Sequence, residues 1–324
     1  MEAEVQDFRT SQVLNLKDSE RNKIYYGFLY NYSSPHTRRA YLKELKKFYG
    51  FIKLRFQGLS EFDVDHAHLV AYKDELLQLG GERAQNLSLN SMNRTFSCLY
   101  AFYDYLLDLG KVKTNPVQRL KRFKIPKEVK TIDLTNEQVE KLLAIIPSES
   151  GVGKLHFAVL TLLFTTGMRQ SELANLRFRH LDYENEYLVL RYMSKGQKEM
   201  VTPLNQRTID AMGSYLKWCI DENFSMDQED FIFRPTINPA SGNLNKRLDG
   251  TSMNYMIKKY AKLIGIKGNV TIHSARSTVI GMLLEKGHSI DLVADFVGHK
   301  DISTTKSYNK RKLSIHQSLS FELA

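Results

Sequence analysis

The sequence predicts a mainly α-helical chain of two domains: a helical bundle, then a mixed α+β domain that combines helices with a small antiparallel sheet. Its 324 residues are enough for two domains of ordinary size. Apolar residues make up 42%, which is enough for packed cores. Apolar residues recur mostly at helical spacing, and only EYLVLRYM and KEMVTPL, joined by the turn SKGQ, have the character of a β-hairpin.

The first domain, residues 1–115, is predicted to be a basic helical bundle. One helix begins after the N-cap Ser34, with Pro35 at its first position. Its inward face is expected to carry Tyr41, Leu45, Phe48, Tyr49 and Ile52. The opposite face carries Arg39, Lys43, Lys46, Lys47 and Lys53.

Three further helices complete this bundle. One is expected from His66 to Leu79, capped by Asp65 and ended by Gly80 and Gly81. Another runs from about Leu87 to Leu109 and is closed by Gly110. Its inward residues are Met92, Phe96, Leu99, Tyr103 and Leu106. The stretch LKDSERNKIYYGFLYNY near the amino terminus adds one more helix.

A basic linker, residues 116–133, is expected to join the two domains. From Lys111 to Lys130 there are eight basic residues and one acidic residue, and prolines interrupt the segment. The second domain, residues 134–324, then begins with a capping box formed by Thr135 and Gln138. An apolar helix follows around residues 155–165, then the hairpin, and from Arg207 the pattern is helical again.

The composition indicates which kind of partner the protein binds and in which cellular compartment it is expected. The net charge of +10 favours a polyanionic partner. The two cysteines, Cys98 and Cys219, have no ligand-type neighbours and are expected to be idle thiols in a reducing cytosol. The longest apolar stretch, FAVLTLLF, is too short to span a bilayer, and the amino terminus does not have the pattern of a signal peptide.

Four short stretches hold polar residues that helix packing does not require. They read TGMRQSEL, SKGQK, HSAR and VGHKDISTTKSY, in this order. Taken singly, each fits a surface arginine, a loop lysine or a structural histidine. Taken together and in register, they resemble the tyrosine recombinases, also called phage integrases. That family carries TGLR-x-SEL, a lysine in a G-K-G-x-K hairpin, H-x-L-R, and a glycine–histidine pair nine residues before a tyrosine.

The resemblance covers about residues 134–312, and the helical first domain suits the family's core-binding domain. Two positions depart from the family pattern. Ala275 stands where a larger apolar residue is usual, and Ser277 stands where histidine or arginine is frequent. Neither departure removes a functional group from the expected active site.

The resemblance implies a simple site-specific DNA recombinase that cleaves and rejoins duplex DNA through a 3′-phosphotyrosyl intermediate and a Holliday junction. The residues assigned to catalysis are Arg169, Lys195, His273, Arg276, His299 and Tyr308. Tyr308 is the nucleophile, Lys195 the general acid and His273 the general base. The two arginines and the second histidine stabilise the phosphate, and Glu172 orients Arg169. No metal, ATP or other cofactor is expected.

The resemblance also implies a partner and an assembly. A dimer would bind an inverted-repeat site and a tetramer would form the synapse, in the cytoplasm and associated with the nucleoid. The apolar residues of the C-terminal tail would dock on a neighbouring protomer. The residues expected to bind DNA are Arg38, Arg39, Lys43, Lys46, Lys113, Arg119, Lys121, Arg122 and Lys124.

Other functions stay open at the level of sequence. A type IB topoisomerase or a telomere resolvase uses a similar pocket, but the histidine-to-tyrosine spacing and the short first domain favour a recombinase. A non-catalytic DNA-binding regulator would be expected to have lost some of the six catalytic residues. A zinc protein is disfavoured because neither motif histidine has a cysteine or carboxylate at ligand spacing.

Overall fold

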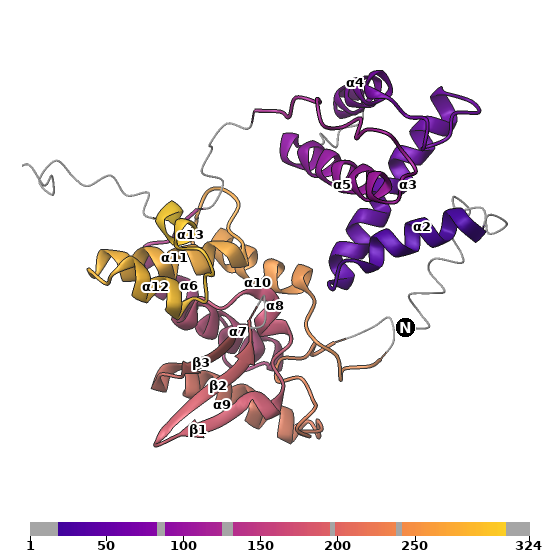
Figure 1. Cartoon of the computed structure of the whole chain (residues 1–324). Coiled ribbons are helices and arrows are strands. Elements are labelled where there is room, and N and C mark those ends of the chain that lie inside the picture. Colours follow the sequence, from indigo (N-terminus) through magenta and orange to yellow (C-terminus); the bar gives the residue numbers. More distant parts are fainter. Residues whose placement is uncertain (1–18, 83–87, 125–131, 195–197, 238–241, 309–324) are drawn as a thin grey trace, which may run out of the picture. The chain divides into compact units, whose positions relative to one another are not determined.

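The computed structural model describes residues 19–82, 88–124, 132–194, 198–237 and 242–308 (Figure 1). The chain divides into two compact units, Met1–Lys127 and Glu128–Ala324, each with its own hydrophobic core. Helices dominate both units, and the second contains one three-stranded antiparallel sheet, so the predicted fold class is confirmed. Across the described residues, no helix has the length and apolar character to cross a bilayer.

The first unit is built from four described helices. They are α2 (Ser19–Tyr30), α3 (Pro35–Arg55), α4 (His66–Glu82) and α5 (Leu89–Asp108). Arg21 of α2 forms a two-pronged ion pair with the buried carboxylate of Glu61, which also accepts from the Tyr25 hydroxyl. This contact joins the first helix to the segment before α4.

The local signals predicted for these helices are largely confirmed. The side chain of Ser34 accepts from the backbone N–H of Thr37, and that of Asp65 accepts from the backbone N–H of His68. The five predicted inward residues of α5 are all buried, and Gly110 follows that helix with φ of 64°. On α3, Phe51 joins the core, whereas Tyr41 and Tyr49 are only half-buried.

The predicted end of α4 is wrong by three residues. The helix continues through Gly80 and Gly81 to Glu82 instead of stopping at Leu79. Glycine in a helix costs about 1 kcal/mol relative to alanine, but its backbone can adopt helical angles. A glycine pair therefore weakens a helix without ending it.

The first half of the predicted linker packs against the helical unit. Val117 and Leu120 are buried in its core. The backbone N–H and C=O of Phe123 both bond to the side-chain amide of Asn93, and Lys73 donates to the carbonyl of Lys121. Residues 125–131 of the predicted linker lie outside the described residues, as do the C-terminal tail from residue 309 and its proposed docking segment.

The second unit surrounds the central apolar helix α7 (Gly151–Thr166). The remaining described elements, in chain order, are α6 (Asn136–Ala144), α8 (Gln170–Ala174), η1 (Phe178–His180), β1 (Leu181–Glu184), β2 (Tyr187–Met193), β3 (Glu199–Pro203), α9 (Gln206–Asp221), α10 (Gly250–Leu263), α11 (Ile272–Glu285), α12 (Ile290–Phe296) and α13 (Ile302–Tyr308). The predicted capping box of Thr135 and Gln138 opens α6, as expected.

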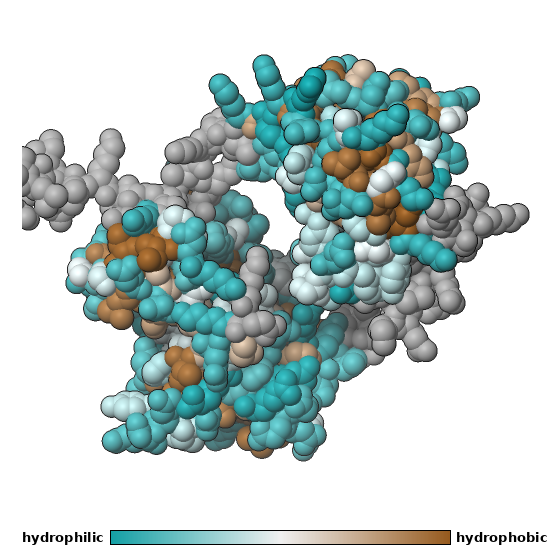
Figure 2. All heavy atoms as spheres, in the orientation of Figure 1, coloured by the Kyte–Doolittle hydropathy of each residue, from teal (hydrophilic) through white to brown (hydrophobic). Residues whose placement is uncertain are grey.

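Figure 2 shows a mostly hydrophilic surface with a hydrophobic patch over the α11–α12 region, where Leu292 is exposed.

The predicted hairpin is confirmed, and a third strand joins it. β2 pairs with β3, with Leu190 opposite Thr202. β2 also pairs with β1, with Leu190 opposite Leu181. No strand was predicted at β1, because most of this four-residue strand is exposed and polar. Its position comes from pairing with β2.

The turn at the end of α7 leads directly to the segment that contains Arg169. Gly167 caps the helix in the left-handed conformation, with φ of 62°. A Cβ at this position would lie 3.3 Å from Val279 and 3.4 Å from Val297, so α11 and the end of α12 approach the glycine closely. Only glycine combines this backbone conformation with this close approach.

Candidate active site

Arg169 lies immediately after the turn that ends α7. Its backbone forms the N-cap of α8, and its N–H bonds to the carboxylate of Glu172 at 2.8 Å. The guanidinium donates through Nη1 to Glu172 Oε1 at 2.8 Å and through Nη2 to the carbonyl of Gly298 at 2.7 Å. The side chain stays 24% exposed. The contacts therefore fix one side of the guanidinium and leave part of it accessible.

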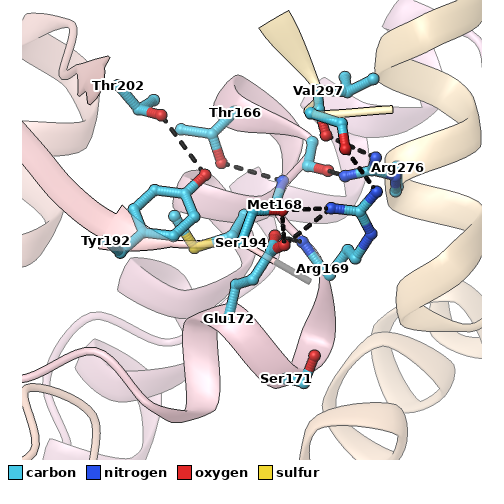
Figure 3. A network of polar contacts seen from close by, with 12 residues as sticks. Thr166, Met168, Arg169, Ser171, Glu172, Tyr192, Ser194, Thr202, Arg276 and Val297 are labelled. Atoms are coloured by element: carbon cyan, nitrogen blue, oxygen red, sulfur yellow. Dashed lines mark hydrogen bonds and ion pairs between the residues drawn. The ribbon is translucent and has the colours of Figure 1, made fainter. Parts of the chain in front are cut away.

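Ser194 completes a three-membered network with Arg169 and Glu172 (Figure 3). Its hydroxyl accepts from Arg169 Nη1 at 2.8 Å and donates to Glu172 Oε1 at 2.8 Å. Burial by itself would raise the pKa of Glu172. Hydrogen bonds from Arg169 and Ser194 outweigh this effect and hold that pKa below its ordinary value. Glu172 is therefore a buried carboxylate that holds both the backbone N–H and the guanidinium of Arg169.

Arg276 is the buried cation of the site, with 3% of its surface exposed. It projects from α11 and donates through Nη1 to the carbonyl of Gly167 at 2.7 Å and through Nη2 to that of Val297 at 2.6 Å. These two residues cap the C-termini of α7 and α12. Carbonyls at helix C-termini carry partial negative charge and lack helical partners, so they stabilise a buried guanidinium.

His299 follows Gly298 directly, so it sits beside both arginines. Gly298 turns the chain after α12 with φ of 66°. The histidine Nδ1 lies 2.8 Å from the hydroxyl of Thr305, a fully buried residue of α13. Burial, and then the charges of Arg276 and Arg169, lower the pKa of His299 to about 4. The imidazole is therefore neutral at pH 7 in a positively charged surrounding.

The remaining predicted catalytic residues are defined to different degrees. His273 is exposed in the first turn of α11, three residues before Arg276. Tyr308 is the last residue of α13, but its side chain is not among those described. Lys195 lies outside the described residues, between Ser194 and Lys198, whose backbones bond to each other at 2.8 Å.

The site presents charge and hydrogen-bond donors to an anion. Arg169, Arg276 and His299 come from regions up to 130 residues apart in the sequence and meet at the carbonyls of Val297 and Gly298. Two guanidiniums and a neutral imidazole beside them are groups that can bind a phosphate. Within the described ranges, no group of three or more histidine, cysteine or carboxylate side chains could hold a metal ion.

Two residues of this site were missed from the sequence. Ser194 occupies the first position of SKGQK, and its partners Arg169 and Glu172 are more than 20 residues away. Thr305 supports His299 from six residues further along the chain. The sequence feature that could have pointed to Ser194 is a hydroxyl residue at the end of a strand, at a position where the family pattern has glycine.

The two departures from the family pattern are accommodated in the core. Ala275 is fully buried among the apolar residues around α7. Ser277 is also fully buried, and its hydroxyl bonds to the carboxylate of Asp133. Ser277 thus connects α11 to the segment before α6 and takes no part in the Arg169 network.

The basic residues expected to bind DNA belong to the first unit. Most of them are exposed, including Arg39, Lys43 and Lys121. Arg38 also has a structural role, because its Nε donates to the carbonyl of Tyr32 at 2.6 Å and its guanidinium lies over the Tyr30 ring. Arg122 donates to the carbonyl of Asn93.

Comparison with known proteins identifies the family. Residues 133–313 match the Phage integrase family, and residues 27–110 match the Phage integrase, N-terminal SAM-like domain. The chain belongs to the phage integrase, or tyrosine recombinase, family. It is accordingly an enzyme of DNA strand transfer, and the resemblance inferred from the motifs is confirmed.

Relatives of this recombinase span most of its length. It is 31% identical to tyrosine recombinase XerC of Oceanobacillus iheyensis over 281 residues, which is 85% of this chain and 86% of the relative. It is 28% identical to a tyrosine recombinase of Pseudothermotoga lettingae over 275 residues, or 85% and 87% of the two chains.

Solved structures share its fold. The pre-cleavage complex of XerH site-specific recombinase with difH substrate has a TM-score of 0.63 and 21% identity, over 87% of this chain and 79% of that chain. A lambda integrase dimer bound to a COC′ core site has a TM-score of 0.65 and 18% identity, over 91% of this chain and 79% of that chain. The observed arrangement of helices with a small sheet is thus that of known recombinases.

Proposed function

We propose that this recombinase cleaves and rejoins duplex DNA at a specific site through a 3′-phosphotyrosyl intermediate. The observation that carries the proposal is the meeting of Arg169, Arg276 and His299 at the adjacent carbonyls of Val297 and Gly298. Tyr308 ends the helix that begins three residues after His299. His299 and the nucleophile thus belong to one short turn and the helix after it, and the two arginines reach that turn from α8 and α11.

In the proposed step, the oxygen of Tyr308 attacks the scissile phosphorus. A bond forms between that oxygen and phosphorus, and the bond from phosphorus to the 5′-oxygen breaks. His273 accepts the phenol proton and Lys195 supplies a proton to the departing 5′-oxygen. Rejoining is the reverse reaction with a new 5′-hydroxyl. Because one phosphoester replaces another, the step balances without ATP.

The arginines have different tasks in this proposal. Three N–H···O contacts hold Arg169, and its other N–H groups have no partner among the described residues. They are available for a non-bridging oxygen of the phosphate, where charge grows during attack. Arg276 is held by two carbonyls from the side of the helix ends and supplies a fixed positive charge. Guanidiniums in these positions provide the charge stabilisation that metal ions give in other phosphoryl transfers.

The DNA partner and the assembly complete the proposal. Structural relatives include a recombinase bound to its difH substrate and an integrase dimer on a core site. By analogy, two protomers of this chain bind inverted half-sites and two such dimers form a synapse that exchanges strands through a Holliday junction. The basic residues of α3 and of the segment 113–124 contact DNA phosphates, and the C-terminal tail docks on a neighbouring protomer.

The proposed cleavage is tested by covalent capture, because this method detects the adduct and identifies the target DNA sequence in one experiment. The protein is incubated with a pool of nicked duplexes that carry randomised sequence in inverted repeats, and denaturation-resistant adducts are isolated and sequenced. The proposal predicts a discrete site and an adduct that Tyr308→Phe abolishes while DNA binding persists. Tyr255→Phe, which removes the same oxygen from an exposed residue of α10, is the matched control.

Other outcomes identify other activities. Tight binding of a selected sequence without any adduct indicates a regulator and contradicts the proposal. Relaxation of supercoiled plasmids without sequence preference indicates a topoisomerase.

A further inference from the structure

The hydroxyl of Ser194 occupies a position that the assigned catalytic groups do not explain. It is a buried residue directly after β2, with 5% of its surface exposed. Its oxygen accepts from Arg169 and its proton goes to Glu172, and both distances are 2.8 Å. A serine hydroxyl has one proton to donate, and here it is used on a carboxylate. Charge-assisted hydrogen bonds of this kind are stronger than those between neutral groups.

The hairpin that begins at Ser194 is attached to the site at two further points. Met200 of β3 contacts Gly298, where a Cβ would lie 3.1 Å from the methionine sulfur. Lys198 Nζ forms an ion pair with Asp295 of α12 at 3.0 Å. This pair is exposed and therefore adds little stability. The buried hydroxyl is thus the attachment that connects the hairpin to a catalytic arginine.

We propose that Ser194 is a positioning residue for strand cleavage, which fixes the guanidinium of Arg169 and the carboxylate of Glu172 to the end of β2. The inference rests on the proposed function, because it concerns the rate of the same cleavage step. Glu172 holds Arg169 from within α8, only three residues away. Ser194 holds the same guanidinium from the sheet and so sets its orientation relative to the hairpin.

The hydrogen bond between Arg169 and Ser194 is expected to affect the rate of cleavage rather than the affinity for DNA. An arginine that stabilises growing charge must have its N–H groups aimed at the position where that charge develops. Removal of the hydroxyl leaves Arg169 with a contact to Glu172 and one to Gly298, and the guanidinium can rotate away from its productive orientation. The positive charge remains, so attraction of the DNA phosphate is preserved.

The experiment compares Ser194→Ala with the wild-type protein on the duplex selected by covalent capture. Single-turnover cleavage should slow by about 10- to 100-fold, since a hydrogen bond to a charged group is lost, while the Kd for DNA changes by less than about threefold. Ser194→Thr keeps the hydroxyl and should restore most of the rate. Thr202→Val is the control, because it removes a buried hydroxyl from β3 that does not contact Arg169 or Glu172.

A double-mutant cycle separates positioning from a loss of folding. If Ser194 acts within the Arg169–Glu172 network, Ser194→Ala should cause a smaller loss in a Glu172→Gln background than in the wild type. Full cleavage by Ser194→Ala, or independent and multiplicative losses in the cycle, would overturn the inference. Failure of the wild-type protein itself to form an adduct would instead count against the proposed function.

Discussion

At the scale of single residues, the site combines buried charge with a histidine that stays neutral. The guanidinium of Arg276 is buried and donates to carbonyls at two helix ends, which stabilise its positive charge. His299 is beside both arginines, and burial together with their charge lowers its pKa to about 4. Under the proposed function, this neutral imidazole would donate a hydrogen bond to the phosphate.

The first prediction concerns the titration of His299 in the protein without DNA. Its imidazole should remain neutral as the pH falls through 6.5 and should gain a proton only near pH 4. The measurement is an NMR titration of the histidine ring protons, with His299→Gln to assign the signal. A midpoint near 6.5 would show that the arginines and burial do not act on this ring as described.

A second histidine connects pH to folding. His156 is buried in α7, its Nδ1 lies 2.9 Å from the Tyr260 hydroxyl, and burial lowers its pKa to about 4. The unfolded chain binds a proton near pH 6.5, before the folded chain does. The contribution of neutral His156 to the free energy of unfolding is therefore fully present above pH 6.5. It is lost as the pH falls from 6.5 toward 4, by up to about 1.4 kcal/mol per pH unit.

Urea unfolding at pH 7 and pH 5 tests this linkage. The free energy of unfolding should fall between these pH values, and it should fall less in His156→Gln, which keeps a polar group beside Tyr260. Equal losses in the two proteins would assign the pH dependence to other groups.

At the scale of elements, turns and helix ends position the residues to which catalysis is assigned. The C-termini of α7 and α12 supply the carbonyls, the N-terminus of α8 carries Arg169, and the hairpin of β2 and β3 contacts Gly298. Gly298 is important for this arrangement because it has a positive φ and has the hairpin against its Cα. The packing of Met200 leaves little room for a side chain there.

Alanine at Gly298 should therefore affect both stability and cleavage. The left-handed conformation costs about 1–2 kcal/mol for a residue with a Cβ. The new Cβ would also displace Met200 or the hairpin, and cleavage should slow by about tenfold or more because a small misplacement of catalytic groups is costly. Stability is measured by urea unfolding and cleavage by single-turnover adduct formation.

Gly287→Ala is the matched control for this prediction. Gly287 also has a positive φ, of 85°, but no atom of the described residues lies within 4 Å of the position that a Cβ would occupy there. It should lose a similar amount of stability and keep normal cleavage. Equal cleavage by the two alanine variants would mean that contact with Gly298 does not hold the hairpin in place.

At the scale of the whole molecule, the chain consists of two units with separate cores. The first core includes Val117 and Leu120, which lie beyond residue 115, the predicted end of the first domain. The segment around them is bound to α4 and α5 through Lys73 and Asn93. The first unit thus depends on residues that the sequence alone had assigned to a linker.

Fragments test this dependence. A fragment of residues 1–127 should unfold cooperatively in urea, as followed by circular dichroism. A fragment of residues 1–115 should be less stable by about 3–6 kcal/mol, because each of the two buried side chains contributes about 1.5–3 kcal/mol. Equal stability of the fragments would mean that residues 116–124 do not contribute to the core.

Sequence reasoning reached the fold class, most helix boundaries and the family because these depend on local patterns. Ser34 and the Thr135–Gln138 pair cap helices through bonds that span three residues. Periodicity placed the buried face of α5. The motif spacing led to the family, which the family match then confirmed, and the assignment of catalytic residues stays a prediction. The predicted end of α4 failed because glycine only weakens a helix.

What the sequence by itself determined is therefore the family, the helical architecture and the chemical types of residue brought to the site. Only the tertiary structure decided how Arg169 and Arg276 are held, since their carbonyl partners at Gly167, Val297 and Gly298 are backbone groups that any residue possesses. It also decided that Ser194 joins the site and that His299 is neutral. These properties come from burial and from contacts between distant segments, and neither is encoded in the spacing of a motif.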